Sequence, residues 1–279
     1  MTELTDLIPR LARLLDRLEA PATSTLDWKA VRAARWSAQS GGLKPILHPQ
    51  RVALKDLLDV DEQKQRVDAN TRQFVAGKPA NNVLLTGARG GGKSSLVKAV
   101  HAKYAPKGLR LIEVDKAGLP SLPDLFDLLA EAAAYRFIVF IDDLTFAENE
   151  PGYASLKAAL DGSLAGPGDN VLIYATSNRR HLMPEYMAEN LATRHVGDEI
   201  HPGEATEEKV SLSDRFGLWV AFHAMEQDAY LAIARHWAAT LGAPADERFE
   251  RAALQWSLGR GARNGRVAWQ FARDWAGRQ

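Results

Sequence analysis

The feature that most constrains this chain is a glycine-rich octapeptide between an apolar segment and a helical pattern. Residues 87–94 read Gly-Ala-Arg-Gly-Gly-Gly-Lys-Ser and match the pattern G-x-x-x-x-G-K-[ST]. A loop of this kind points successive backbone N–H groups at phosphate oxygens, with the positive end of the next helix behind them. Residues 83–85 predict a strand before the loop, and residues 93–104 predict a helix after it. This context favours a phosphate-binding loop over a simple glycine turn.

The loop predicts a site for ATP, or another nucleoside triphosphate, together with Mg²⁺. Lys93 would reach the β- and γ-phosphates as a compact charge, and Ser94 would offer its hydroxyl to the metal ion. The glycines let the backbone approach an oxygen closely and take positive φ. The predicted nucleotide contacts of this segment are Gly87, Ala88, Arg89, Gly90, Gly91, Gly92, Lys93, Ser94 and Ser95.

Around the loop, continuous apolar segments alternate with helical patterns. The apolar segments predict strands at residues 109–114, 137–141 and 171–175. The helical patterns fall at residues 93–104, 123–131 and 153–164. Apolar strands that alternate with amphipathic helices are typical of a parallel sheet covered on both faces. We therefore expect a three-layer α/β fold of the P-loop NTPase type.

The two ends of the chain show helical patterns only. Leucines at helical spacing predict an amphipathic helix over residues 4–20, and residues 22–50 look irregular to partly helical. The C-terminal helices are predicted at residues 228–241, 246–258 and 265–277, with a core of Trp237, Trp256, Trp269 and Trp275. The expected domains are an N-terminal helical extension (1–49), a nucleotide-binding α/β domain (50–222) and a helical lid (223–279).

Acidic and amide side chains stand at the ends of two predicted strands. Asp142 and Asp143 follow the strand at 137–141, and Asn178 follows the strand at 171–175. The carboxyl ends of strands in an open α/β sheet border the ligand crevice. Asp142 would hold the metal ion, Asp143 would polarise an attacking water, and Asn178 would contact the γ-phosphate and orient that water. The alternatives are a helix cap for the carboxylates and a turn residue for the amide.

Composition excludes several classes of function. The 279 residues contain no cysteine, which excludes disulfides, thiolate metal sites and a cysteine nucleophile. The formal net charge is zero, so no global basic field collects nucleic acid or anionic membrane. The N-terminus carries acids where a signal peptide carries bases, and no apolar run is long enough to span a membrane. We expect a cytoplasmic protein with no membrane partner.

These motifs, in this order, resemble the AAA+ ATPases over roughly residues 50–279. The resemblance adds residues 57–64, similar to the segment that flanks the adenine, and implies a nucleotide contact at Val60. Residues 212–217 look like the box that carries an arginine finger, which implies that Arg215 acts on the γ-phosphate of a neighbouring subunit. Residues 261–268 look like the second sensor, which implies that Arg266, or alternatively Arg263, contacts ATP from the lid.

Two stretches, residues 79–90 and 174–182, look more narrowly like the bacterial domain-of-unknown-function 815 family. That resemblance implies an AAA+ ATPase of unassigned cellular role. It implies a homo-oligomer, as an open assembly or a ring such as a hexamer, and an unidentified protein or nucleic-acid client. The predicted catalytic residues are Lys93, Asp143, Asn178, Arg215 and Arg266, and the predicted metal ligands are Ser94 and Asp142.

The sequence departs from the AAA+ pattern in three places. Asp143 stands where many members have Glu, and one methylene less could make hydrolysis slow. Residues 115–119 lack the aromatic-hydrophobic-glycine pattern of protein-threading members, which argues against a processive unfoldase. Gly91 stands where Thr is usual, which should leave phosphate binding intact because the backbone N–H is the ligand.

Three hypotheses follow for the function. The first is an ATP-hydrolysing switch or remodeller, and the second is a binding or loader module with little or no hydrolysis. The third is a small-molecule kinase, which would leave Arg215 and the lid arginines unexplained. A nucleic-acid client stays open: residues 179–181 and 194–195 could form a basic edge, or simply a solvated loop face.

Overall fold

The computed structural model describes most of the chain apart from its first 25 residues and several loops. The described residues are 26–38, 42–50, 52–146, 151–161, 166–178, 194–196, 199–201 and 212–278. The helix predicted over residues 4–20 and the basic residues 179–181 lie outside them. Within the described part, no helix is both long and apolar enough to cross a bilayer.

A seven-stranded sheet forms the centre of the molecule, in the order β2-β1-β4-β5-β6-β3-β9. Its strands are β1 (Ala33–Ser37), β2 (Gly42–Pro45), β3 (Val83–Gly87), β4 (Leu109–Val114), β5 (Arg136–Ile141), β6 (Val171–Ser177) and β9 (Leu218–Phe222). Neighbours from β1 to β9 run parallel, and only the β1–β2 pair is antiparallel. A separate antiparallel pair joins β7 (Arg194–Val196) and β8 (Glu199–His201). The parallel sheet confirms the fold class that the alternation of apolar and helical segments predicts.

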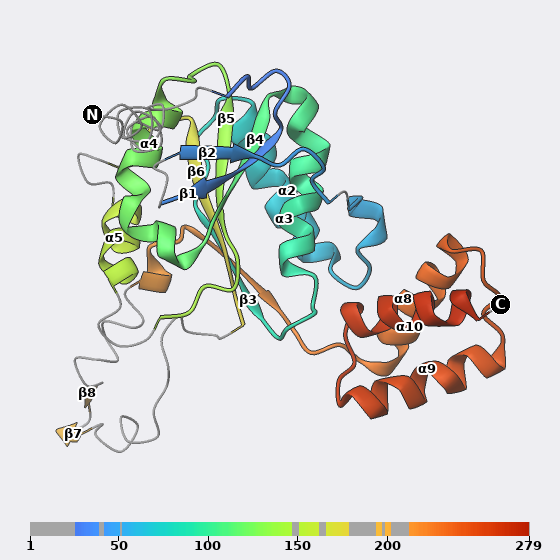
Figure 1. Cartoon of the computed structure of the whole chain (residues 1–279). Coiled ribbons are helices and arrows are strands. Elements are labelled where there is room, and N and C mark those ends of the chain that lie inside the picture. The colour runs from blue at the N-terminus through green and yellow to red at the C-terminus, as the bar shows by residue number, and fades with distance from the viewer. Residues whose placement is uncertain are drawn as a thin grey trace, which may run out of the picture.

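Helices cover both faces of this sheet, with α2 and α3 on one side and α4 and α5 on the other (Figure 1). The helices of the sheet domain are α2 (Asp61–Val75), α3 (Lys93–Tyr104), α4 (Leu122–Ala130) and α5 (Pro151–Leu160), with 3-10 turns η1 (Leu54–Asp56), η2 (Ala105–Lys107) and η3 (Lys116–Ser121). Strand β5 shows why two layers form. Phe137 and Val139 enter the core under α4 and α5, whereas Ile138 and Phe140 enter the core under α2 and α3.

The lid consists of α8 (Gln227–Thr240), α9 (Glu247–Arg260) and α10 (Gly265–Gly277), which share a third apolar core. Figure 1 shows it beside the sheet domain, reached through β9. Trp237, Trp256 and Trp275 pack against this core, as predicted. Trp269 does not: it lies 37% exposed on the other face of α10, with Arg273 stacked over its ring.

Two parts of the sheet differ from the sequence prediction. Residues 22–50 were expected to be irregular to partly helical, but β1 and β2 lie in this segment and extend the sheet. The alanines of β1 favour helix on their own, so pairing with β4 decides the conformation. Strand β9 was not predicted, and it places Phe222 directly opposite Gly87. The domain boundaries at 49 and 222 stay predictions.

Candidate nucleotide site

The glycine-rich loop joins the end of β3 to the start of α3 and needs glycine at specific positions. Gly87, Gly90 and Gly92 have φ of 133°, 79° and 102°, which other residues rarely adopt. A Cβ added to Gly87 would lie 2.1 Å from the carbonyl oxygen of Phe222, and one added to Gly90 would lie 2.5 Å from the Asn264 amide oxygen. Gly91 has neither a positive φ nor so close a contact. The conformation of the loop therefore requires glycine at positions 87, 90 and 92, but not at position 91.

Helix α3 begins at this loop without a side-chain cap. Its N-cap is Gly92, which has no side chain to accept from the first-turn N–H groups, and its first turn holds no acidic residue. Ser95 lies half-buried in the same turn. Uncapped N–H groups at the start of a 12-residue helix are a fitting environment for a phosphate anion.

Lys93 lies buried behind the loop, with only 5% of its surface exposed. Its Nζ donates to the carbonyl oxygens of Gly87 at 2.6 Å and Ala88 at 2.9 Å, and to Asn178 Oδ1 at 3.0 Å. Burial lowers the pKa of Lys93 below its usual value, and the nearby carboxylates of β5 counteract this only in part. The ammonium group is thus shielded from water, where its attraction for an anion would be strong.

Asp142 lies at the end of β5, directly beside the loop. Its Oδ1 accepts from the Ser94 hydroxyl at 2.6 Å and from the Thr176 hydroxyl at 2.6 Å. Within the described residues, its Oδ2 accepts no hydrogen bond. Strands β5 and β6 are paired neighbours, which explains how residues 34 positions apart meet here.

Asp143 follows in a left-handed conformation, with φ of 55°. Its backbone N–H donates to Thr176 Oγ1 at 2.9 Å, and its carboxylate accepts from the Asn178 amide. Arg89 of the loop approaches the other carboxylate oxygen at 3.6 Å. The carboxylate is about half exposed, so it can meet water as well as these partners.

The oxygen ligands present fit magnesium. A hydroxyl and a carboxylate, those of Ser94 and Asp142, lie together where the loop would present phosphates. Among the described residues, no cluster of three or more His, Asp or Glu side chains could hold a metal ion alone. Mg²⁺ is usually held in this way, by one or two protein oxygens, substrate phosphates and water.

The lid reaches this site through the start of α10. Asn264 caps that helix by accepting from the Val267 N–H at 3.0 Å, and its side chain lies against Gly90. Arg266 lies close enough to lower the pKa of Lys93. Arg263 lies on the exposed surface and donates to Gln227 at 3.5 Å. Both arginines are exposed, and Arg266 is the one whose charge acts on Lys93.

Arg215 and Val60 lie on other segments than the loop. Arg215 pairs with Asp161, directly after α5, and its side chain is 25% exposed. Val60 is buried at the start of α2, in the core that includes Phe222. Its neighbour Leu58 packs against the lid core instead, so this segment touches both domains. Among the described residues, no contact joins Arg215 to the phosphate loop.

One residue at this site was missed by sequence reasoning. Thr176 makes two hydrogen bonds that join Asp142 to Asp143. The available signal was its position at the end of an apolar strand, two residues before Asn178. No known motif marks a threonine there.

The family assignment follows from a match over nearly the whole chain. A family model described as "Protein of unknown function (DUF815)" matches residues 29–279. The chain belongs to this family. No match is found among curated protein sequences.

Solved structures share the architecture at low sequence identity. A mutant of Thermotoga maritima RuvB is 14% identical with a TM-score of 0.50, and the match covers 79% of this chain and 64% of that chain. A second RuvB mutant is 13% identical with a TM-score of 0.48, over 79% of this chain and 63% of that one. The chain thus spans somewhat less than two thirds of each RuvB chain. The likeness to the first of these structures supports the α/β fold described above.

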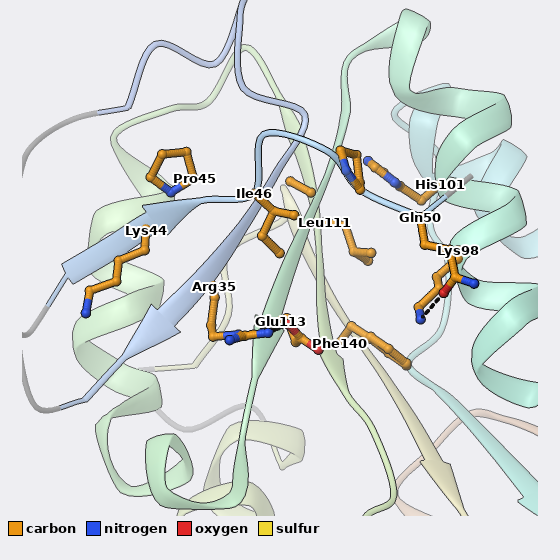
Figure 2. Close-up of a pocket in the computed structure, with 12 residues that line it drawn as sticks. Arg35, Lys44, Pro45, Ile46, Gln50, Lys98, His101, Leu111, Glu113 and Phe140 are labelled. Atoms are coloured by element: carbon orange, nitrogen blue, oxygen red, sulfur yellow. Dashed lines mark hydrogen bonds and ion pairs between the residues drawn. The ribbon is translucent and has the colours of Figure 1, made fainter. Parts of the chain in front are cut away.

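A separate hollow of about 430 Å³ lies between β2 and α3, above β1 and β4 (Figure 2). Within the hollow, Arg35 pairs with Glu113 at 2.8 Å, and Lys98 donates to Gln50 at 3.1 Å. Its single lining carboxylate is therefore already engaged, and no glycine loop borders it. We place the nucleotide chemistry at the phosphate loop.

Proposed function

We propose that this protein is a Mg²⁺-dependent ATPase of the AAA+ class that acts as a nucleotide-dependent switch or remodeller. The observation that carries the proposal is the convergence at one sheet edge of Lys93, Ser94, Asp142, Asp143 and Asn178, five residues from three separate segments. A bound Mg²⁺ would neutralise charge on the β- and γ-phosphates.

The contacts of Lys93 suggest what nucleotide binding changes. In the structure, its Nζ donates to two loop carbonyls and to Asn178. Phosphate oxygens are stronger acceptors than carbonyls, because a hydrogen bond between two charged groups is shorter and stronger. The lysine would therefore exchange partners and release the Asn178 amide to orient water.

Asp143 is the candidate general base. Its side chain is one methylene shorter than the Glu of many AAA+ members, and its left-handed backbone redirects it. The amide of Asn178 and the guanidinium of Arg89 each contact one of the two carboxylate oxygens. Both contacts would have to loosen before it accepts a proton, which supports slow hydrolysis.

Arg215 is the candidate finger for a neighbouring subunit. Its own chain holds it against Asp161, far enough from the loop that no contact joins them among the described residues. An arginine that is delivered in trans commonly accelerates phosphoryl transfer by about 10³-fold to 10⁵-fold. We infer that assembly must replace the contact with Asp161 by one with the neighbour's γ-phosphate.

A mixing experiment tests this shared site directly. Lys93→Ala protein retains Arg215 but has an inactive phosphate loop. Arg215→Ala protein retains the phosphate loop but lacks the arginine finger. Each alone should release phosphate at a small fraction of the wild-type rate. Their mixture should recover a substantial share of the activity, because one supplies the finger to the other.

Two results would contradict this scheme. An unchanged rate in Lys93→Ala protein would remove the loop from the chemistry. Full activity in Arg215→Ala protein, independent of protein concentration, would remove the finger. Wild-type activity per subunit should rise with protein concentration if the site is completed by assembly.

A second function is favoured by one observation, the double pairing of Asp143. If those contacts persist with ATP bound, the protein would be a binding or loader module that uses ATP to fix its shape. Tight ATP binding without phosphate release, alone and with candidate partners, would favour that function. The client, protein or nucleic acid, would be recovered with Asp143→Asn protein held in ATP.

A further inference from the structure

A single hydroxyl, that of Thr176, joins the two carboxylate residues of the site. The side chain lies at the end of β6 and is 1% exposed. Its Oγ1 donates to Asp142 Oδ1 at 2.6 Å and accepts from the Asp143 N–H at 2.9 Å. The hydroxyl therefore acts as a donor toward Asp142 and as an acceptor toward Asp143.

The main chain of Thr176 holds the same turn. Its carbonyl oxygen accepts from the Leu144 N–H at 2.6 Å. Two consecutive N–H groups after β5 are thus bound by one residue of β6. A turn anchored twice in this way is fixed relative to the neighbouring strand.

This anchoring matters because Asp143 has a backbone conformation that non-glycine residues rarely adopt. Its φ of 55° is unfavourable for a residue that carries a Cβ. Such a conformation persists only where the surroundings over-determine it. The Thr176 hydroxyl supplies one of the bonds that do so, and the left-handed turn sets the direction of the Asp143 carboxylate.

The hydroxyl also selects which oxygen of Asp142 stays available. Ser94 and Thr176 both donate to Oδ1. Oδ2 accepts no hydrogen bond within the described part of the chain, so its lone pairs are free for another ligand. Removing the Thr176 hydroxyl would let the carboxylate rotate and would leave its orientation to Ser94 alone.

We propose that Thr176 is a positioning residue, which orients Asp142 for Mg²⁺ and holds the turn that aims Asp143 at water. This inference rests on the proposed ATPase function. An apolar residue of the same shape would fill the buried position at the end of β6 without needing hydrogen-bond partners. The choice of threonine is explained by the two acidic residues that it joins.

Replacing the hydroxyl by a methyl group should weaken both steps. Loss of a partner that orients a metal ligand commonly reduces metal affinity or activity by about 10-fold to 100-fold. In Thr176→Val protein we expect the Mg²⁺ concentration for half-maximal hydrolysis to rise by at least about 10-fold. We expect kcat to fall as well, with KM for ATP at saturating Mg²⁺ nearly unchanged. Thr176→Ser protein should recover most of both losses.

A matched control separates positioning from simple loss of stability. Thr71 is also a fully buried threonine whose hydroxyl makes two hydrogen bonds, to the Val67 carbonyl and the Tyr174 hydroxyl. It lies on α2, away from the phosphate loop. Thr71→Val protein should lose thermal stability to a similar degree, yet keep the wild-type Mg²⁺ dependence.

The decisive experiment measures phosphate release against Mg²⁺ concentration, and ATP affinity by calorimetry with and without Mg²⁺, for all four proteins. Thr176→Val protein that keeps wild-type Mg²⁺ dependence and kcat would overturn the inference and leave the ATPase proposal intact. Equal losses in Thr71→Val and Thr176→Val proteins would also overturn it. Wild-type protein that does not bind ATP would overturn the proposed function, and this inference with it.

Discussion

Two buried cations lie at opposite ends of the strands of the same sheet, and their surroundings differ in kind. We call the side where the parallel strands end the carboxyl-end edge, and the side where they begin the amino-end edge. Lys93 lies at the carboxyl-end edge and Arg110, the second residue of β4, at the amino-end edge; each residue is 5% exposed. Burial is the main reason why the pKa of each is lowered. Arg110 donates to the carbonyl of Trp28, to Ala105 O at 3.0 Å and to Leu109 O at 2.9 Å.

The difference lies in what surrounds these hydrogen bonds. Beside Lys93 are the carboxylates of Asp142 and Asp143, which raise its pKa, and the amide of Asn178. Beside Arg110 lie the ring of Tyr135, 4.5 Å from the guanidinium, and the like charge of Arg32. Arg110 ties three chain segments together through fixed carbonyls, whereas the partners of Lys93 can be exchanged for phosphate. We propose that one edge serves stability and that the other serves nucleotide binding and hydrolysis.

The largest expected effect comes from Lys93→Met. Hydrolysis should fall by about 100-fold to 1,000-fold, the usual loss when a group that stabilises transition-state charge is removed. The free energy of unfolding should change by less than about 1 kcal/mol, because the cost of burying the Lys93 charge offsets the hydrogen bonds that it donates. Steady-state phosphate release and urea denaturation measure the two quantities. A large loss of stability would show that both edges are structural.

Arg110→Met should give the opposite result. Three carbonyls would lose their hydrogen bonds to the guanidinium, and we expect the free energy of unfolding to fall by about 3–5 kcal/mol. Urea denaturation at constant pH measures this fall. The rate of hydrolysis per folded molecule should stay near the wild-type value; a rate as low as that of Lys93→Met protein would erase the distinction between the edges.

His101 extends the comparison at the amino-end edge. Its Nε2 lies 2.9 Å from the Arg32 carbonyl, and burial lowers its pKa to about 4 from 6.5. In the unfolded chain His101 binds a proton below about pH 6.5, whereas in the folded chain it does so only below about pH 4. Stability should therefore fall by about 3 kcal/mol as pH drops through that window. Denaturation curves of wild-type and His101→Gln proteins should differ in this pH dependence; parallel curves would contradict the prediction.

The smallest expected effects separate two adjacent glycines. Gly90→Ala introduces a Cβ at positive φ, 2.5 Å from Asn264, and should cost about 1–2 kcal/mol and weaken ATP binding. Gly91→Ala meets Ala88 O at 3.3 Å without a positive φ, so stability should change by less than about 1 kcal/mol. Thermal unfolding and ATP calorimetry of both variants test this contrast. Equal effects would mean that the loop does not distinguish the two positions.

The carboxyl-end edge could be predicted from the sequence because its chemistry follows the chain. The loop is recognised from eight consecutive residues. Asp142 and Asn178 each stand at the end of an apolar strand. In a parallel sheet those ends meet, so proximity follows once the strands are identified. The hydrogen bonds among Ser94, Asp142, Asp143 and Asn178 agree with that expectation.

Other features could not be predicted, for a common physical reason. Arg110 acts through backbone carbonyls, which every residue possesses, so no pattern marks its partners. Thr176 acts across two strands at a register that only pairing defines. The contact between Arg215 and Asp161 likewise joins residues 54 positions apart. Strand β1 has too little β-propensity to be recognised without its neighbour β4.

The most direct test of the two-edge account is the stabilisation that Mg²⁺-ATP confers on unfolding. At 100 times the dissociation constant, ATP should raise the free energy of unfolding of the wild-type protein by about 2.7 kcal/mol. Arg110→Met protein should gain the same increment from its lower baseline, and Lys93→Met protein should gain almost none. An equal increment in Lys93→Met protein, or none in the wild type, would contradict the account.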